Sequence, residues 1–218
     1  MLDKRFSFAT TEDFDKHIEK SIRGFGDLYN IICELSGWFL ERGSIVYDIG
    51  CSTGRLIELL QEHYPGYDYV GIEREHAFIK KQNPADGRRY INADAIDVNY
   101  PNASIVTCIF TLQFIPQNKR AQLIKKIYDS INVGGAFIIA EKVRADSALG
   151  QDILTFAHYD YKATGFEANE ILSKERDLRM MLKPITSTEN IEMFTAAGFR
   201  TVEQFWQNYC FKAWLCVK

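Results

Sequence analysis

The sequence predicts an α/β fold built on a doubly wound, largely parallel sheet. Short apolar runs typical of buried strands alternate along the chain with segments whose apolar residues have helical spacing. The first such run, residues 46–49, passes directly into a glycine-bearing turn and then into a helical pattern. The chain closes with two strand-like segments, 201–206 and 209–217, which are near enough in sequence to form an antiparallel hairpin.

The first part of the chain, residues 1–42, is predicted to be helical. Apolar residues such as Phe14 and Ile18 recur there at the spacing of one helix face. Gly24 and Gly26 interrupt the pattern. We therefore expect N-terminal helices that are broken at these glycines.

The middle of the chain repeats a strand followed by a helix or turn. This alternation favours parallel strands, because each crossover returns the chain to the same edge of the sheet. Gly134-Gly135 is expected to form the turn before the last of these strands. The predicted strands are 46–49, 69–73, 89–95, 104–110 and 136–141, and the clearest predicted helices are 56–60 and 119–131.

Residues 145–185 carry no strand signal and are predicted to form a helical insert. Two helices are expected, separated near Thr164-Gly165 and rich in aromatic residues. We expect this insert to lie over the strand ends and to cap a pocket there. A further helix over residues 187–197 ends at Gly198, a residue suited to a helix C-terminus.

Length and composition favour one domain covering residues 1–218. A chain of 218 residues with 46% hydrophobic content can bury one sizeable core, and no linker divides it. The formal net charge of -3 argues against broad electrostatic binding of nucleic acid. Because no apolar stretch of about 18 residues and no signal-peptide core is found, we expect a cytoplasmic protein without membrane contact.

Cysteine and histidine residues give no indication of a metal site. The 5 cysteines include no C-x-x-C pair, and the 4 histidines lie far apart in the sequence. We interpret the cysteines as reduced core thiols. A reactive thiol at Cys51, in the turn after the first strand, is the alternative.

The turn after the first strand is the strongest indication of a ligand. Its residues follow the pattern Asp-x-Gly-x-Ser-x-Gly, from Asp48 through Gly50 and Ser52 to Gly54. A dinucleotide fingerprint requires G-x-G-x-x-G, so NAD fits poorly. The pattern instead resembles the first motif of the class I S-adenosylmethionine (SAM) methyltransferases. A tight strand-to-helix turn in an unrelated α/β protein is the alternative.

Two later acids support a SAM pocket. Glu73 ends the second predicted strand about 25 residues after Asp48, near the spacing at which such folds place a carboxylate on ribose hydroxyls. Asp94 ends the third strand, where the resemblance implies that Asp94 and Ala95 contact adenine. The residues expected at the methionine end of SAM are Gly50, Cys51, Ser52 and Gly54.

Several further segments carry a narrower resemblance. They are Phe110-Thr111-Leu112-Gln113-Phe114, Gly134-Gly135 with Glu141-Lys142, His158-Tyr159-Asp160-Tyr161-Lys162, Gly165-Phe166 with Glu170-Ile171, and Ala197-Gly198-Phe199. Together they resemble the carboxy-S-adenosylmethionine (carboxy-SAM) synthase family, from about Phe14 to the C-terminus. The resemblance implies a seven-stranded Rossmann-like methyltransferase sheet with an antiparallel last strand. It also implies conversion of SAM and prephenate into a carboxylated sulfonium used in tRNA wobble-uridine modification.

The same resemblance implies a catalytic arginine in the helical insert. The family holds the new carboxylate with an arginine, and Arg176 is the matching residue if one extra residue is accommodated. A planar guanidinium suits this task because it pairs with a carboxylate through two hydrogen bonds. A surface arginine paired with Glu175 or Asp177 is the alternative. Arg179 and Lys142 are further cations in this part of the sequence.

Three positions depart from the family pattern. Phe25 replaces a tyrosine and lacks its hydroxyl, and Ile109 replaces an asparagine just before Phe110. Glu73-Arg74 stands where the family has Asp-Asn. Losing a hydrogen-bond partner in a buried site typically costs about 1 to 3 kcal/mol, so these changes suggest altered chemistry. We still expect Phe25, Arg74, Ile109 and Phe110 to lie around SAM.

The sequence leaves three functions open. The leading hypothesis is SAM-dependent methyl transfer to a small-molecule acceptor, which requires the protein to align a nucleophile and exclude water. The alternative is carboxy-SAM synthesis, and a third is a catalytically silent SAM-fold subunit. His158, Tyr159 and Tyr161 are candidate catalytic bases, with packing as their alternative role. The sequence also allows the protein to form a homodimer.

Overall fold

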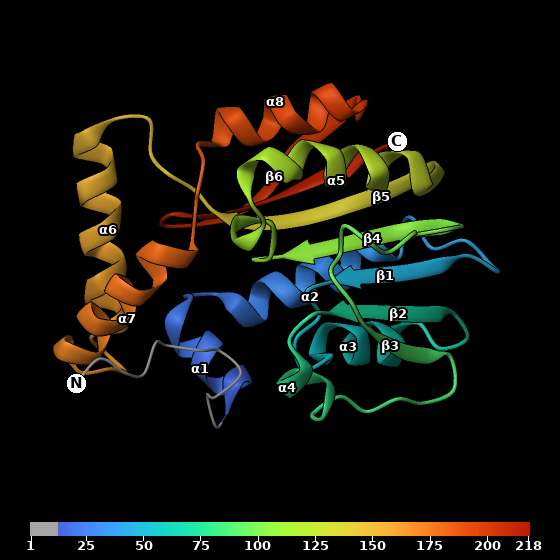
Figure 1. Ribbon diagram of the computed structural model, residues 1–218, viewed down its shortest axis with the longest axis horizontal. Coiled ribbons are helices and arrows are strands. Elements are labelled where there is room, and N and C mark those ends of the chain that lie inside the picture. The colour runs from blue at the N-terminus through green and yellow to red at the C-terminus, as the bar shows by residue number, and fades with distance from the viewer. Residues whose placement is uncertain (1–12) are drawn as a thin grey trace.

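The computed structural model describes residues 13–218 and contains a seven-stranded sheet (Figure 1). Its strands are β1 (Ile45–Ile49), β2 (Asp68–Glu73), β3 (Arg88–Asn92), β4 (Ala103–Ile109), β5 (Ile131–Lys142), β6 (Thr201–Asn208) and β7 (Phe211–Val217). Their order in the sheet is β3-β2-β1-β4-β5-β7-β6. The first five run parallel, and β7 runs antiparallel to its neighbours β5 and β6. The predicted fold class is therefore confirmed.

Helices cover both faces of this sheet. They are α1 (Phe14–Ser21), α2 (Phe25–Ser36), α3 (Arg55–His63), α4 (His76–Ile79), α5 (Gln117–Ser130), α6 (Ala148–Lys162), α7 (Ala168–Met181), α8 (Ser187–Ala197) and the short 3-10 helix η2 (Leu112–Phe114). Ile105 belongs to the core cluster with α2 and α3, and Val106 to the cluster with α5 and α8. Because these neighbours point to opposite buried faces, β4 has one continuous apolar run.

The described part of the N-terminal segment forms two helices, α1 and α2. The side chain of Asp13 caps α1 by accepting a hydrogen bond from the backbone amide of Lys16. Between the helices, Gly24 has a φ of 74°, in the left-handed region that favours glycine. Gly26 lies inside α2, so only Gly24 marks a break. Residues 1–12 of the predicted helical segment lie outside the described residues.

The predicted insert forms α6 and α7, which are separated at Thr164-Gly165 as expected. The hydroxyl of Ser147 caps α6 by accepting from the amide of Gly150, and Glu167 and Glu170 form a reciprocal capping box on α7. Figure 1 shows α1, α6 and α7 at the left, beside the carboxyl ends to which the arrows of β1 and β4 point. The insert therefore lies where the sequence analysis expects a cap.

Two strand boundaries differ from the prediction for identifiable reasons. β5 starts at Ile131 because this residue pairs with Ala103, and the register then shifts before Ala136 pairs with Ile105. Gly134-Gly135 therefore lies within an irregular strand. β3 ends at Asn92 instead of residue 95, and Asp94 accepts a hydrogen bond from the amide of Ile96 in the turn that follows.

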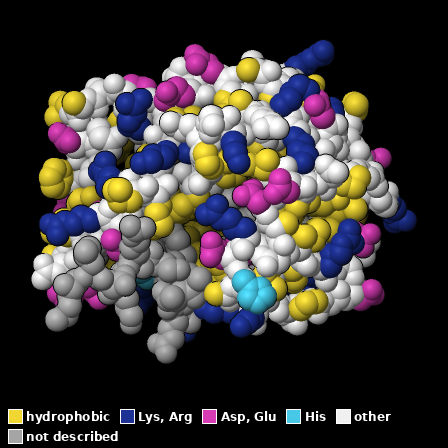
Figure 2. Space-filling model, viewed as in Figure 1, with side chains coloured by type: hydrophobic (Ala, Val, Ile, Leu, Met, Phe, Trp, Pro, Cys, Tyr) yellow, Lys and Arg dark blue, Asp and Glu magenta, His cyan; other side chains and the backbone are white. Residues whose placement is uncertain are grey.

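The surface carries charges of both signs. Figure 2 shows basic and acidic side chains interspersed with apolar and neutral ones over the face it presents. Within residues 13–218, no helix combines the length and apolar character needed to cross a membrane. The 5 cysteines of the chain are all buried and unpaired by disulfides.

Candidate functional site

A cavity of about 430 Å³ lies at the carboxyl ends of the central strands. Its walls come from the segments after β1, β2, β3 and β4, and from α1, α6 and α7. This volume is within the usual range for sites that enclose a small molecule. The carboxyl edge of an open parallel sheet is also where α/β folds bind their ligands. The cavity is therefore the candidate active site.

Gly50 and Gly54 both adopt left-handed backbone conformations, with φ of 72° and 89°. A Cβ atom at Gly50 would collide with the side chain of Thr111, and a Cβ atom at Gly54 would collide with the ring of Tyr90. Gly50 lines the cavity, whereas Gly54 is not among the lining residues. The ring of Tyr90 fills the space beside Gly54. This glycine therefore allows the ring to pack against the turn, and it does not line the cavity where a ligand contact was expected.

Glu73 holds the turn after β1 in place from the neighbouring strand. Its side chain accepts hydrogen bonds from the backbone amides of Ser52, at 3.0 Å, and Glu75, at 2.8 Å. Glu73 is only 6% exposed and lines the cavity. Burial raises the pKa of this carboxyl above its usual value, and the two backbone hydrogen bonds oppose the shift. The carboxylate is thus fixed between the turn and the cavity.

Asp48 is the most deeply buried acid of the cavity wall, at 3% exposure. The Thr107 hydroxyl donates to its carboxylate over 2.6 Å. Burial raises the pKa of Asp48 to about 7, the Thr107 hydrogen bond opposes this shift, and the charge of Glu73 adds to it. Asp48 therefore changes its protonation state near neutral pH.

Asp94 and Ala95 reach the cavity from the turn after β3. The Asp94 carboxylate accepts from the amide of Ile96 over 3.1 Å, which fixes its orientation. Arg74 also lines the cavity and lies 3.6 Å from the carboxylate of Glu75. We call Asp48, Glu73, Glu75 and Asp94 the acidic side of the cavity.

Cys51 lines the cavity from the same turn as Gly50. Its sulfur accepts a hydrogen bond from the Gln82 amide over 3.4 Å. Burial raises the pKa of the Cys51 thiol well above its usual value, and the charges of Asp48 and Glu73 raise it further. The thiol is therefore protonated, which disfavours the alternative of a reactive cysteine at this position.

Aromatic rings form the wall between the two ends of the cavity. The ring of Phe110 lies 6.3 Å from that of Phe25 and 5.4 Å, edge-on, from that of Phe211. Phe110 has a φ of 53°, and its backbone is held by the amide-to-carbonyl hydrogen bond to Ala140, at 2.7 Å. Ile109 also lines the cavity. This strained but fixed turn presents apolar surface to a ligand.

A buried polar network supports that turn from behind. The Glu141 carboxylate accepts from the amide of Leu112 over 2.9 Å, and the Gln113 side chain bonds the carbonyl of Phe110 and the amide of Lys142. Burial raises the pKa of Glu141 to about 8, although Arg120 lowers it. Apart from Arg120, these residues stand in the segments that carry the family resemblance. Their contacts could not be predicted from the sequence, because the partners are distant in the chain.

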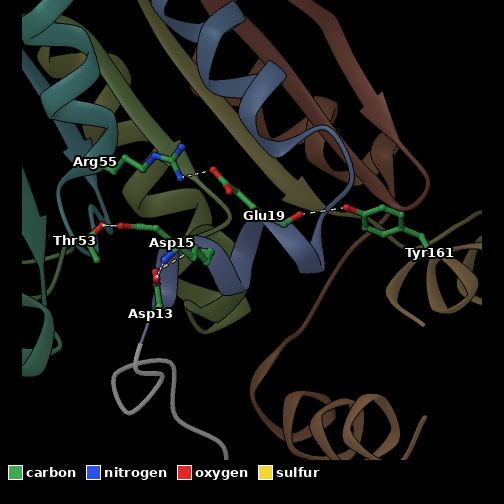
Figure 3. Close-up of polar contacts among 7 residues, drawn as sticks. Asp13, Asp15, Glu19, Thr53, Arg55 and Tyr161 are labelled. Carbon is green, nitrogen blue, oxygen red and sulfur yellow. Dashed lines mark hydrogen bonds and ion pairs between the residues drawn. The ribbon is translucent and has the colours of Figure 1, made fainter. Parts of the chain in front are cut away.

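Helix α1 closes the cavity through contacts that sequence analysis did not predict. Figure 3 shows the Thr53 hydroxyl donating to the carboxylate of Asp15, at 2.9 Å, and Arg55 paired with Glu19 at 2.6 Å. The Tyr161 hydroxyl of α6 donates to the carbonyl of Glu19 over 3.2 Å. These contacts join α1 both to the turn after β1 and to the insert. No local sequence pattern predicts these contacts, because the two partners of each contact are far apart in the sequence.

His158 lines the cavity, and its side chain makes a hydrogen bond to the backbone. Its Nε2 lies 2.9 Å from the carbonyl oxygen of Ser21, which can only accept, so Nε2 carries the proton. Burial lowers the pKa of His158 to about 4, and Lys142 and Lys162 lower it further. The ring is therefore neutral at pH 7, with Nδ1 left as an acceptor. Tyr159 is not among the cavity's lining residues.

Three lysines, not the predicted arginine, bring positive charge to the helical end of the cavity. Arg176 is exposed on α7 and is not among the lining residues, because the side of α7 that is buried carries Glu175 and Leu178. Tyr159 interacts with Glu175 and Arg179 instead of facing the cavity. We call Lys142, Lys162 and Lys174, which do line the cavity, its lysine side.

Most of the predicted site residues thus surround one cavity, although they come from separate strands and helices. Phe14, Asp15 and His17 of α1 are further lining residues that the sequence analysis missed. Gly54, Tyr159 and Arg176 are the predicted residues that it leaves outside the lining. The predicted residues that line the cavity are Phe25, Asp48, Gly50, Cys51, Ser52, Glu73, Arg74, Asp94, Ala95, Ile109, Phe110 and His158.

Comparison with known proteins gives matches over nearly the whole chain. Residues 47–137 match a family described as "Methyltransferase domain". A carboxy-S-adenosyl-L-methionine synthase from Staphylococcus epidermidis is 32% identical over 210 residues, which cover 93% of this chain and 92% of that protein. A synthase of the same name from Methylococcus capsulatus is 33% identical over 227 residues, which cover 99% and 94%.

Solved structures show the same fold at lower identity. Human N-acetylserotonin methyltransferase in complex with SAM is 14% identical, with a TM-score of 0.58 over 94% of this chain and 57% of that chain. This chain therefore spans a little over half of that structure, and the likeness concerns the fold. The relatives that match nearly the full chain show the family to which it belongs. The protein is a SAM-dependent transferase, and its chain belongs to the carboxy-S-adenosyl-L-methionine synthase family.

Proposed function

We propose that this protein synthesises carboxy-SAM from SAM and prephenate. The observation that carries the proposal is the division of charge in the cavity, with acids at one end and lysines at the other. A cationic sulfonium nucleoside suits the acidic side, and an anionic carboxyl donor suits the lysine side. The relatives that match nearly the full chain are named for this product.

The residues of the acidic side fit an adenosyl sulfonium. Glu73 is positioned to accept hydrogen bonds from ribose hydroxyls, and Asp94 with Ala95 to contact adenine. Gly50, Cys51 and Ser52 would lie at the methionine end. The rest of the pocket would be closed by Phe25, Arg74, Ile109 and Phe110. SAM supplies a methyl carbon that is activated by the positive charge on sulfur.

The proposed reaction sets two demands on this chain. One hydrogen of the SAM methyl carbon is replaced by a carboxyl group. In prephenate the bond between the ring and its ring carboxyl group breaks and the ring hydroxyl leaves as hydroxide, which yields carbon dioxide and an aromatic keto acid. The methyl carbon loses a proton, which combines with the hydroxide to give water, and it forms the new carbon–carbon bond to the carbon dioxide. The buried aromatic wall of Phe110 and Phe211 excludes water from this step. We propose that His158, neutral and with Nδ1 as an acceptor, accepts a hydrogen bond from the water that forms; with its pKa lowered to about 4 the ring does not hold the proton itself. Tyr159 and Arg176 lie outside the cavity wall and take no part in this scheme.

Methyl transfer to a small-molecule acceptor is the second candidate. It is favoured by the exposed position of Arg176, the residue expected to hold the new carboxylate. The apolar Phe25 and Ile109, where the family has polar side chains, also leave fewer groups to bind a carboxylated ligand. A methyl transferase needs only an aligned nucleophile in a dry cavity.

The insert has exposed apolar side chains that bear on how the protein assembles. On α6, Leu149, Ile153 and Phe156 are spaced as one helical stripe and are 71%, 57% and 65% exposed. Leu172 and Met180 on α7 are 48% and 80% exposed. Apolar side chains gathered in this way commonly mark a protein interface. We propose a homodimer formed through this stripe, to be tested by light scattering of the wild type and of Phe156→Asp.

The cellular setting follows from the same proposal. Five buried cysteines without disulfides suit a reducing compartment, which supports a cytoplasmic location. The product would serve tRNA wobble-uridine modification, as the family resemblance implies. The mixed charges on the face in Figure 2 support small-molecule substrates over direct, broad binding of nucleic acid.

One experiment separates the two candidate functions. Purified protein is incubated with SAM and prephenate, and the nucleoside products are identified by mass spectrometry. A product heavier than SAM by one carboxyl group, absent without prephenate, is the expected result. If SAM is instead converted only to its demethylated form in the presence of a methyl acceptor, the carboxy-SAM proposal is overturned in favour of methyl transfer.

A further inference from the structure

We infer that Lys142 and Lys162 bind a carboxylate of the second substrate, an organic acid. This inference rests on the proposed function and assigns the substrate's anionic group to named residues of the cavity. The two lysines come from different elements, the end of β5 and the end of α6, and meet at the same wall. In the sequence analysis both lysines stand in segments that carry the resemblance, and Lys142 is a further cation, but neither is assigned to a ligand.

The two ammonium groups share one carboxylate. Glu175 Oε1 lies 3.5 Å from Lys142 Nζ and 3.9 Å from Lys162 Nζ. Both distances exceed the roughly 2.7 to 2.9 Å of a charge-assisted hydrogen bond, so neither pair is tight. Glu175 is not among the lining residues, whereas both lysines are. Both lysines therefore belong to the cavity wall, whereas the carboxylate that pairs with them does not.

The charges at this wall do not balance. Burial alone would raise the pKa of Glu175, but Lys142 and Lys162 outweigh it and lower that pKa, so the carboxylate is ionised. One negative charge then faces Lys142 and Lys162, and Arg179 also acts on it; burial lowers the pKa of Lys162, and the charge of Glu175 opposes that shift. The lysine side chains are only 18% and 4% exposed, so water screens the excess weakly.

The other groups that face this pair add no negative charge. His158 is neutral at pH 7 because burial lowers its pKa to about 4. Burial and the nearby Lys162 lower the pKa of Lys174 to about 7, so it adds positive charge in part of the molecules. Cys210 is a buried thiol whose pKa is raised by burial. A buried excess of positive charge is stabilised by an anion; within residues 13–218 no carboxylate besides Glu175 pairs with these lysines, which leaves a place for the anion of a ligand.

The position of the lysines favours the second substrate over SAM's own carboxylate. In the sheet, β5 is separated from β1 by β4, so Lys142 lies about 10 Å from the turn after β1 at the usual strand spacing. Glu73 is the last residue of β2 and Asp94 follows β3, on the opposite side of β1. An adenosyl group held by these acids extends away from Lys142, which leaves the space before the lysines for a second molecule.

The rings next to the lysines fit the rest of such a molecule. Phe211 lies between Phe110 and His158, with ring-centre distances of 5.4 Å and 5.1 Å. An organic acid could place its apolar body on these rings and its carboxylate on the ammonium groups. Prephenate, which has a ring and carboxylates, is the probe of this chemistry.

Calorimetry tests the inference directly. Prephenate is titrated into protein saturated with S-adenosylhomocysteine, for the wild type, Lys142→Gln, Lys162→Gln and the charge-keeping Lys142→Arg. Lys119→Gln, an exposed lysine away from the cavity, is the matched control. We expect each glutamine variant to weaken prephenate binding by about tenfold or more, from the loss of one charged hydrogen bond. Lys142→Arg and Lys119→Gln should stay within about threefold of the wild type.

Glu175→Gln supplies a change of opposite sign. Removing the carboxylate that pairs with both lysines should strengthen prephenate binding, by about threefold or more. A merely structural role of the three residues would weaken binding in every variant. Circular dichroism and the affinity for S-adenosylhomocysteine report whether each variant is folded. Should Lys162→Gln not fold, Lys142→Gln and Glu175→Gln still decide the outcome.

The possible failures are distinguishable. Unchanged prephenate affinity in Lys142→Gln, or no prephenate binding by the wild type, overturns the inference. Equal weakening of S-adenosylhomocysteine also overturns it, because the lysines would then hold the carboxylate of the SAM methionine. If prephenate binds through the lysines but no carboxylated product forms, the proposed function fails and the anion site stands.

Discussion

The two sides of the cavity carry opposite charges on different kinds of scaffold. The acidic side lies at and just after the carboxyl ends of β1, β2 and β3, where Thr107 of β4 holds Asp48 and the amide of Ser52 binds Glu73. The lysine side joins the end of β5 to α6 and α7, elements separated by loops. The comparison teaches that one pocket can bind a cation and an anion separately. Substitutions on each side should therefore affect different ligands.

Gly50→Val should have the largest effect, because the acidic side depends on the turn at Gly50. At a φ of 72° a β-branched residue is strained by about 1 to 3 kcal/mol. Its Cβ would also collide with Thr111, and overpacking costs about 1 to 3 kcal/mol more. We expect the free energy of unfolding, measured in urea, to fall by about 3 kcal/mol or more.

Gly43→Val is the matched control for this change. Gly43 has a φ of 78°, but no atom lies within 4 Å of a Cβ built there. It should therefore show the backbone strain without the collision. Equal losses of stability in the two variants would show that the contact with Thr111 does not matter.

Asp48→Asn should change how stability depends on pH. Between its usual pKa of 3.8 and its pKa of about 7 in the folded protein, Asp48 holds a proton that the unfolded chain has released. The folded state then binds more protons, so this group makes stability fall as the pH rises through that window. Relative to Asp48→Asn, the wild type should lose at most about 3 kcal/mol between pH 4 and pH 7.

The difference between the two proteins is the useful quantity here. His17 and His158, each with a pKa lowered to about 4, make stability rise with pH over part of the same range. These contributions are common to the wild type and Asp48→Asn, so they cancel. Urea unfolding curves at several pH values measure the difference. Parallel curves for the two proteins would contradict the burial of an Asp48 carboxyl that titrates near neutrality.

Glu73→Ala tests the assignment of the acidic side to SAM. Removing this carboxylate should weaken binding of SAM about tenfold to a hundredfold, by the loss of hydrogen bonds to a charged group. Glu62→Ala is the matched control, since Glu62 is an exposed acid of α3 that does not line the cavity. Calorimetry with SAM and with prephenate measures both affinities. A Glu73→Ala protein with unchanged SAM affinity would remove the ribose assignment, and lost prephenate binding would break the division between the sides.

Arg55→Ala should have the smallest effect. It tests the role of α1, the helix that contacts both sides of the cavity. The side chains of Arg55 and Glu19 are 33% and 41% exposed, so their ion pair contributes less than about 1 kcal/mol. We expect SAM affinity to fall by no more than about fivefold. Lys125→Ala, which breaks an exposed ion pair with Asp129 far from the cavity, is the control. A much larger loss would show that α1 is an integral wall of the acidic side.

The acidic side could be predicted because its signals are local. A strand, a glycine turn and an acid at the strand end lie within a few residues of each other, and parallel strands bring such ends to one edge. Glu73 and Asp94 were found in this way. Gly54 shows the limit of the method, since the sequence cannot tell whether the space beside a glycine is filled by a ligand or by Tyr90.

The lysine side could not be predicted with the same detail. Residues on an amphipathic helix are assigned to its buried or exposed face by the packing of other elements. The resemblance selected Arg176, but the packing of α7 buries Glu175 one residue earlier and leaves Arg176 exposed. Lys142 and Lys162 stand in segments that carry the resemblance, but no local pattern gives them a shared role, and they meet only because β5 and α6 end at the same wall.

The sequence by itself determined the order of strands and helices, the turn from Asp48 to Gly54 and the acids that follow the strands. These depend on hydrophobic periodicity and backbone conformation, which act over short stretches of chain. The tertiary structure alone decided that α1 closes the cavity and that Lys142 and Lys162 share Glu175. Contacts between distant segments depend on how whole elements pack, and no short stretch of sequence contains that information.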